Sequence, residues 1–257
     1  LGQSLYLLGL VRREQGDFVG AAVMFEEGIA FHRALGDGEG MAVGLLALGD
    51  VARDQGDAAQ VRRYCEDSLA LVRKLGVQWA IGFSLNNLAL AAYHEGDLTN
   101  ALGLVNESVS LFRSLKADGS LAEVLITQGQ ILWAQGEAAA ASTALTEALQ
   151  FAWAVGPRLM VAAALEGLAC VAVPQGDAEL AARLLAAAAA LREQMGTPMR
   201  PVDQSTVEQA LATARSILGE EDLAAVWAEA QSLPVEQILN GLSSVAVFTA
   251  VGDRSEP

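Results

Sequence analysis

The chain of 257 residues carries a formal net charge of −15 at pH 7; 53% of its residues are hydrophobic but only 5% are aromatic. This negative charge repels phosphate backbones and anionic lipid headgroups, which argues against nucleic-acid and membrane partners for this segment. The two cysteines, Cys65 and Cys170, have no metal-binding spacing and predict a reduced, cytoplasmic location.

Taken in chain order, the first regular feature is a glycine that returns every forty residues through five copies. It lies in a triplet of the type Gln-Gly-Asp, with a leucine eleven residues before it and a core-type residue nine residues after it. The five glycines are Gly16, Gly56, Gly96, Gly136 and Gly176. An internal period of this length predicts an array of stacked structural repeats.

Each repeat has the pattern of two helices joined by the glycine turn. In the first repeat, Leu1, Leu5 and Leu8 define one face of a first helix, and a second helix is expected from about residue 18 to 35. We expect the turn glycine to adopt the left-handed conformation that ends many helices. Position 28, counted from the start of each repeat, holds only small residues and predicts a close approach of two helix backbones. These residues are Gly28, Ser68, Ser108, Ala148 and Ala188.

The period sets the expected domain organisation. The repeats span residues 1–40, 41–80, 81–120, 121–160 and 161–196. Beyond them the register fails, although helical patterns return at 207–218, 223–230 and 235–242. We therefore expect an all-α, right-handed α-solenoid of five to six helical hairpins, with an atypical helical C-terminal cap over 197–251 and a disordered tail over 252–257. Strands are not expected, because alanine and leucine are abundant and residues 1–156 contain no proline.

The spacing within the first repeat resembles the signature of the tetratricopeptide (TPR) family. The matching residues are Leu8, Gly9, Gly16, Ala21, Phe25 and Gly28. The chain departs from that family in its period of forty rather than thirty-four residues, and in lacking the usual proline near the end of the second helix. Residues 85–89, Leu-Asn-Asn-Leu-Ala, resemble the longer repeats of kinesin light chains. The resemblance implies a binding array rather than an enzyme.

The C-terminal part is similar to a second group of proteins. Residues 181–192, 214–219, 227–230 and 234–238 resemble the segment that closes the TPR region of large bacterial ATPase regulators of the LuxR and maltose-regulator type. This similarity implies a parent protein with a nucleotide-binding switch module and a DNA-binding or cyclase module. Neither module lies within these residues, and Leu1 in place of a start methionine is consistent with a piece of a longer chain.

No motif in the sequence predicts catalysis, a cofactor or a metal. The chain contains no phosphate-binding loop and no dinucleotide-binding glycine motif. Its only two histidines are His32 and His94, too few for a histidine-rich metal site. His32 shares its repeat position with Val72, Phe112 and Ala152, which predicts a packing role. His94 falls in a variable position, where either solvent exposure or a ligand contact is open.

A binding surface is expected where the repeats differ from one another. On the first helices, positions 3, 6, 10 and 13 vary and form one stripe. The first helices line the concave groove of TPR arrays, so the resemblance implies that this stripe faces a ligand. The candidate ligand-binding residues are Arg13, Asp50, Arg53, Phe83, Asn86, Tyr93, Gln130 and Trp133.

We expect the ligand to be an extended peptide or an elongated small molecule. Its anionic part would lie near Arg13 and Arg53, and its aromatic or apolar part near Tyr93 and Trp133. In the alternative reading, the two arginines only neutralise nearby carboxylates such as Glu14 and Asp54, and Trp133 packs on Tyr93.

Two function classes remain open. The first is an interaction or effector-sensing module of a bacterial signalling or transcriptional regulator, which binds a protein, a peptide or a small-molecule effector. The second is a constitutive scaffold or self-association module of the kinesin-light-chain type. Because a preceding repeat would normally cover residues 1–14, their outer side is also expected to be adhesive and to support a homodimer.

Overall fold

The computed structural model describes residues 1–199, 201–232 and 237, and the chain divides into two compact units, Leu1–Lys116 and Ala117–Pro257. Within the described residues, every regular element is a helix and there is no strand. The predicted all-α architecture of TPR-like helical hairpins is confirmed. The predicted helix at 235–242 and the predicted tail at 252–257 lie outside the described residues, apart from residue 237.

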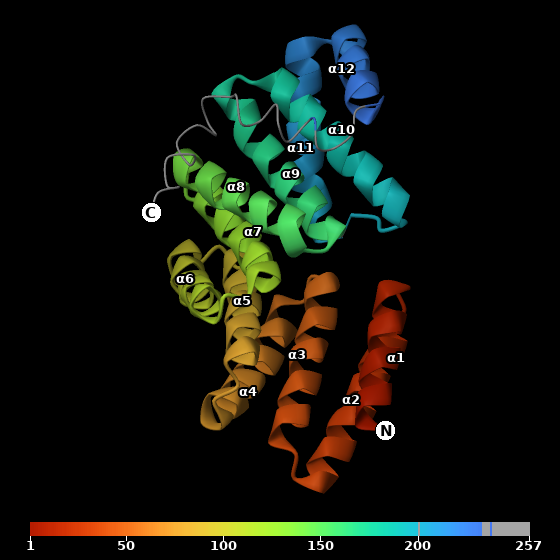
Figure 1. Cartoon of the computed structure of the whole chain (residues 1–257), viewed down its shortest axis with the longest axis vertical. Helices are drawn as coiled ribbons and strands as arrows, with labels where there is room; N and C mark the ends of the chain where they lie inside the picture. Colours follow the sequence, from red (N-terminus) through yellow and green to blue (C-terminus); the bar gives the residue numbers. More distant parts are fainter. Residues whose placement is uncertain (200, 233–236, 238–257) are drawn as a thin grey trace. The chain divides into compact units, whose positions relative to one another are not determined.

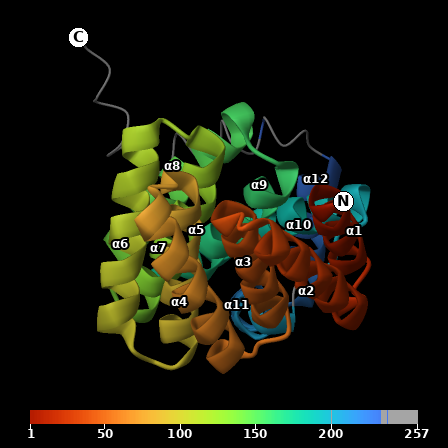
Figure 2. The same ribbon diagram turned by 90° about the horizontal axis from the view of Figure 1, so that it is seen from below.

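The unit Leu1–Lys116 contains three antiparallel hairpins. Its helices are α1 (Gly2–Glu14), α2 (Phe18–Leu35), α3 (Gly38–Asp54), α4 (Ala58–Leu75), α5 (Gln78–His94) and α6 (Leu98–Leu115). The hairpins α1/α2, α3/α4 and α5/α6 lie side by side in chain order (Figures 1 and 2). Each second helix also packs against the next first helix, so an apolar core runs between the hairpins.

The unit Ala117–Pro257 contains two further helical hairpins, followed by two more helices. Its helices are α7 (Asp118–Ala134), α8 (Ala138–Val155), α9 (Arg158–Ala172), the 3-10 turn η1 (Val173–Gln175), α10 (Ala178–Met195), α11 (Pro201–Leu218) and α12 (Glu220–Ser232). Helices α11 and α12 both pack on α10, and α11 also contacts α9. The helical patterns predicted at 207–218 and 223–230 are therefore confirmed as parts of α11 and α12.

One stretch of this unit is apolar enough to be compared with a membrane span. The window Arg158–Gln175 has a mean hydropathy of 1.3 over 18 residues. In the structure 61% of this window is buried inside the protein, where α9 packs against α8, α10 and α11. Its hydropathy is accounted for by packing in the core of the unit, the usual position of such a helix in a helical array.

The turn glycines have the predicted left-handed backbone. All five have φ between +75° and +88°: Gly16 +78°, Gly56 +75°, Gly96 +82°, Gly136 +83° and Gly176 +88°. A residue with a side chain rarely adopts this left-handed backbone conformation, which explains why glycine returns at each turn.

The acidic residue after each turn glycine begins the second helix. Asp17 and Asp57 accept hydrogen bonds from the backbone amides of Gly20 and Gln60 at 2.9 and 3.0 Å. Asp97 and Asp177 act in the same way, as does Asp37 at the start of α3, which accepts from Gly40 at 3.0 Å. Glu137, the glutamate in the series, makes no such bond. A short carboxylate satisfies an amide that the first helical turn would leave unpaired.

Position 28 is the close contact that its small residues predict. Ser68 donates a hydrogen bond to the carbonyl of Ala42 at 2.9 Å, and Ser108 donates to the carbonyl of Gly82 at 2.8 Å. Each bond joins the second helix to the first helix of the same hairpin. At Gly28 an added Cβ would lie 3.8 Å from the nearest side-chain atom, an ordinary contact distance.

Candidate functional site on the first helices

Five polar residues join the first helices of the N-terminal unit. We define the polar cluster as Arg13 of α1, Asp50, Arg53 and Asp54 of α3, and Asn87 of α5. The three residues of α3 are spaced i, i+3 and i+4, so helical geometry places them on one face. Because α3 contacts both α1 and α5, this face meets polar side chains from both neighbours.

The polar cluster is a connected network. The Nε of Arg13 donates to Asp54 at 2.6 Å, and its Nη1 lies 3.5 Å from Asp50. The Nη1 of Arg53 donates to the amide oxygen of Asn87 at 2.6 Å, and the Nδ2 of Asn87 donates to Asp50 at 2.9 Å. These contacts bridge α1 to α3 and α3 to α5, so the first helices are held side by side in this unit.

The charges of the polar cluster balance, since two guanidinium groups face two carboxylates. The side chain of Arg53 is only 9% exposed, whereas those of Arg13 and Asp50 are 21% and 25% exposed. Because these charges are largely buried, removing one member of a pair would leave the other unpaired, and an unpaired buried charge is strongly destabilising. Asp54 therefore has the neutralising role that the alternative reading gave it, and Asp50 shares that role. The accessible part of the cluster is the looser contact between Arg13 and Asp50.

Asn86 is the least accessible of the predicted ligand-binding residues. It is 1% exposed, and neither its amide oxygen nor its amide nitrogen has a hydrogen-bond partner within the described part of the chain. A buried amide without a protein partner is a position for a bound water molecule or for a polar group of a ligand. Its neighbour Asn87, which the sequence analysis did not select, supplies the contacts to the polar cluster instead.

The remaining candidates are half-buried. Phe83 packs against the ring of Phe112, with ring centroids 4.9 Å apart, and Tyr93 lies 5.1 Å from the ring of His94. Gln130 and Trp133 lie on α7, in the other unit. The structure thus brings Arg13, Asp50 and Arg53 into direct contact, whereas the binding roles of all eight candidates stay predictions.

The polar role of Asn87 could have been predicted from the residues at its repeat position. Position 7 of the repeats holds Leu7, Ala47, Asn87, Thr127 and Gly167. A single carboxamide in an otherwise small or apolar position indicates a specific polar partner. Position 7 lies beside the variable stripe of positions 3, 6, 10 and 13, on the neighbouring side of the helix.

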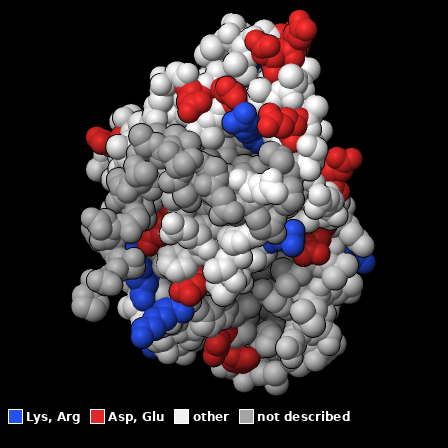
Figure 3. All heavy atoms as spheres, turned by 45° about the horizontal axis from the view of Figure 1, so that its top comes forward, with Lys and Arg blue, Asp and Glu red and all other residues white. Residues whose placement is uncertain are grey.

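The surface electrostatics agree with the composition. On the face in Figure 3, acidic side chains are spread over the described surface with few basic side chains between them.

Among the described residues, no three histidine, cysteine, aspartate or glutamate side chains are grouped closely enough to hold a metal ion.

Comparisons with known proteins support the repeat fold. A tetratricopeptide repeat family model matches residues 81–152, which correspond to α5–α8 and their connections. A search of the curated proteins found no match.

Solved structures with the same fold are distant in sequence. One is BtubC (BKLC) from P. vanneervenii, with 18% identity, a TM-score of 0.60, and coverage of 77% of this chain and 82% of that chain. Two others are structures of nearly identical TPR-like repeats from Podosopora anserina, described as a kinesin light chain. The first has 16% identity, a TM-score of 0.55 and coverage of 76% and 96%; the second has 15% identity, a TM-score of 0.53 and coverage of 85% and 97%. At these identities the similarity concerns the fold.

Proposed function

We propose that this chain is a non-catalytic protein-interaction module that binds an extended segment of a partner protein along the first helices of the unit Leu1–Lys116. The polar cluster is the observation that carries this proposal. It sets partly exposed charged groups, at repeat positions 10 and 13, across neighbouring first helices. Residues that vary between repeats are free of the stacking requirement, and the TPR-like fold supplies a stack of such helices.

The contacts within the polar cluster limit the chemistry of the segment. Asp50 is 25% exposed and offers carboxylate oxygens to backbone amides of a bound peptide. An acidic side chain of the segment would bind the exposed part of Arg13, on the side of its 3.5 Å contact with Asp50, which is looser than its 2.6 Å contact with Asp54. The half-buried ring of Tyr93 offers an apolar contact farther along the unit. We therefore propose a segment with one acidic and one apolar anchor.

The experiment selects binding peptides from a displayed random library and measures their affinity for variants. Asp50→Asn keeps the shape of the side chain, and Tyr93→Ala removes the ring. Each is expected to weaken binding about tenfold, as for loss of one charged hydrogen bond or one aromatic anchor. Asp67→Asn on the exposed face of α4 is the matched control and should bind like the parent. Equal affinities for Asp50→Asn, Tyr93→Ala and the control would reject this surface as the binding site.

We further propose that the module belongs to a larger signalling or transcriptional regulator and responds to an effector. The support is the resemblance of residues 181–192, 214–219 and 227–230 to the closing segment of LuxR-type and maltose-regulator-type proteins. A nucleotide-binding module is then expected in the continuous reading frame upstream of Leu1. An upstream reading frame that encodes no nucleotide-binding module would contradict the proposed regulator and would favour the alternative function, a constitutive scaffold.

A second candidate function, self-association, rests on the apolar surface of α1. Leu7, Leu8 and Val11 are 54%, 44% and 48% exposed. The corresponding residues of the next repeat include Leu48 and Val51, each only 4% exposed within a core cluster. The same helix face is therefore covered in one repeat and open in the other. Sedimentation should reveal a dimer that Leu8→Glu dissociates, whereas Val19→Glu on α2, at a site 75% exposed, should leave it intact. A monomer at all concentrations would contradict this function.

A further inference from the structure

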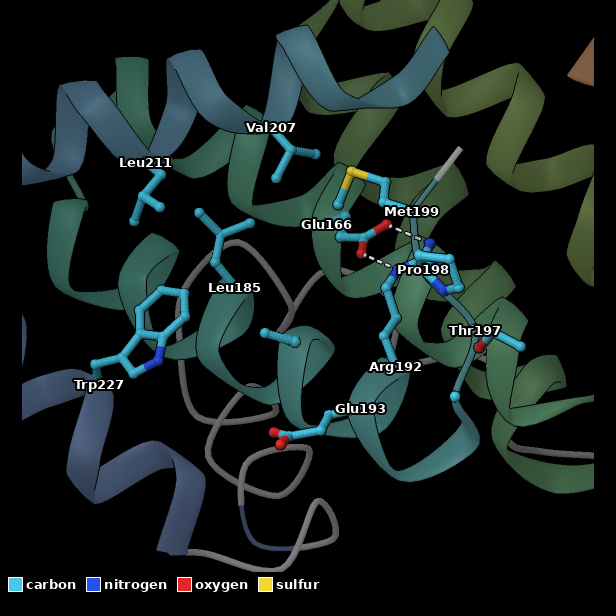
Figure 4. Close-up of a pocket in the computed structure, with 12 residues that line it drawn as sticks. Glu166, Leu185, Arg192, Glu193, Thr197, Pro198, Met199, Val207, Leu211 and Trp227 are labelled. Carbon is cyan, nitrogen blue, oxygen red and sulfur yellow. Dashed lines mark hydrogen bonds and ion pairs between the residues drawn. The ribbon is translucent and has the colours of Figure 1, made fainter. Parts of the chain in front are cut away.

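A cavity of about 460 Å³ lies in the unit Ala117–Pro257, where α9, α10, α11, α12 and the connection after α10 meet. Its walls are mainly apolar and come from Leu185, Ala189, Met199, Val207, Leu211 and Trp227 (Figure 4). Cavities of several hundred cubic ångströms with apolar walls and a few polar groups are the usual sites of small ligands. At roughly 30 Å³ for each water molecule of liquid volume, this space corresponds to a molecule of about fifteen non-hydrogen atoms.

The charged groups of this cavity stand where some of the other repeats have apolar core residues. At position 6, Leu46 and Ile126 are buried apolar residues, Asn86 is a buried amide, and the fifth repeat has Glu166. At position 32, Val72 and Phe112 are completely buried, and the fifth repeat has Arg192. The apolar residues Leu46 and Val72 of the second repeat thus have an ion pair as their equivalent in the fifth repeat, at the edge of a cavity. Stability does not explain the change, because a buried ion pair is often no more stabilising than a well-packed apolar pair.

The ion pair is well formed and mostly buried. The Nε and Nη2 of Arg192 donate to the two carboxylate oxygens of Glu166 at 2.5 and 2.9 Å, as drawn in Figure 4. The side chains are 12% and 8% exposed. Burial by itself lowers the pKa of Arg192, but the hydrogen bonds and charge of Glu166, together with the charge of Asp203, raise it overall. The guanidinium is therefore charged and already neutralised.

The first repeat has a second, smaller cavity at the equivalent place. This smaller space, about 280 Å³ in the unit Leu1–Lys116, is lined by Tyr6, Phe25, His32 and Asp37. They occupy the repeat positions of Glu166, Leu185, Arg192 and Thr197. Here too position 32 is ionisable, and the Nδ1 of His32 lies 2.8 Å from Asp37.

The charges around the larger cavity select the kind of ligand. Glu193 lines the cavity, and its carboxylate adds to that of Glu166 against the guanidinium of Arg192. Among the described lining residues, two carboxylates and one guanidinium leave a charge of −1, which disfavours an anion and favours a cation. The indole of Trp227 lines the same cavity and offers a ring face to a cationic group.

We propose that this cavity binds a small molecule with an apolar body and a protonated amine. The apolar body fills the space between Leu185, Val207 and Leu211, and the amine lies at the rim near Glu193 and Trp227. The Oγ1 of Thr197 is buried and has no hydrogen-bond partner within the described chain, so it is available to a polar group on the ligand. The site is separate from the first-helix surface and does not depend on the function proposed for that surface.

The test compares three probes that share one apolar body and differ in charge. Phenylbutylamine, phenylbutanol and phenylbutyrate are titrated into the full chain at pH 7 and followed by amide and indole chemical shifts. The amine is expected to bind about tenfold more tightly than the carboxylate, with the alcohol between them. Glu193→Gln should weaken the amine about threefold and leave the alcohol unchanged, and Glu208→Gln, an exposed control on α11, should change neither.

A second pair of variants tests the location. Ala189→Leu places a larger side chain in the cavity and should reduce the affinity for all three probes at least about tenfold. Ala212→Leu makes the same change on the exposed side of α11 and should have no effect. Equal affinities for the amine and the carboxylate would overturn the proposed ligand class. An Ala189→Leu variant that binds the probes like the parent would overturn the site.

Discussion

Two glycines of the α5/α6 hairpin, one in its turn and one inside α6, allow a test in which substitution by alanine has opposite effects on stability. An added Cβ at Gly96 or at Gly103 would meet no atom within 4 Å, so neither change creates a clash. Gly96 has φ +82°, where an L-residue costs about 1–2 kcal/mol, partly offset by the reduced freedom of the unfolded chain. Gly103 lies inside α6, where alanine is more favourable than glycine by about 1 kcal/mol.

We therefore expect Gly96→Ala to destabilise the α5/α6 hairpin by about 1 kcal/mol and Gly103→Ala to stabilise it by a similar amount. The difference of about 2 kcal/mol corresponds to roughly a thirtyfold change in the opening equilibrium, since each 1.4 kcal/mol is tenfold. Native-state hydrogen exchange measures it hairpin by hairpin. Effects in a repeat array should be largest in α5 and α6 and smaller in α1. Stabilisation by both substitutions would refute the backbone argument, and a uniform change over the unit would refute local opening.

Three further predictions concern packing and burial. Gly28→Ser should stabilise the first hairpin by about 1 kcal/mol in thermal unfolding, because serine at this position donates to the first helix elsewhere; Gly28→Ala measures the part due to helix propensity alone. Glu166→Leu should destabilise by about 3 kcal/mol in urea unfolding by leaving a buried guanidinium unpaired, and adding Arg192→Val should recover most of the loss. Burial raises the pKa of Cys65 and Cys170 from 9.0 to about 12, so both thiols should resist labelling at pH 8 until the protein unfolds. The same shift makes stability fall as pH rises from 9 towards 12, because only the unfolded thiols release their protons in that range.

The repeat fold was predictable because its turns depend on local chemistry. A left-handed turn selects glycine, the amide at the helix start selects aspartate, and two close backbones select a small residue. These requirements recur at fixed spacing, so Gly96, Asp97 and Ser108 each have an equivalent in other repeats. Comparison of the repeats with one another supplied information that a single domain does not contain.

The candidate site was less predictable because its contacts join residues far apart in sequence. Arg13 and Asp54 are separated by 41 residues, and Arg53 and Asn87 by 34. Which nitrogen meets which oxygen depends on side-chain rotamers and on the spacing of neighbouring helices, and neither follows from periodicity. Asn86 shows the same limit, since its position on the variable stripe suggested access but its side chain is buried. The cavity beside Arg192 was not predicted either, because it depends on how α9, α10, α11 and α12 pack together.

The aspartates that begin α2, α3 and α4 make the N-terminal unit sensitive to acid. Backbone hydrogen bonds, with smaller side-chain contributions, lower the pKa of Asp17, Asp37 and Asp57 below the ordinary value of 3.8. Each carboxylate therefore favours the folded state above that value and loses its effect as acid protonates it. Of the two equivalent residues in the other unit, Asp177 makes such a bond and Glu137 does not. Acid should consequently cause local unfolding at the turns of successive hairpins in Leu1–Lys116. This unit should therefore lose stability gradually as pH falls, and not in a single step.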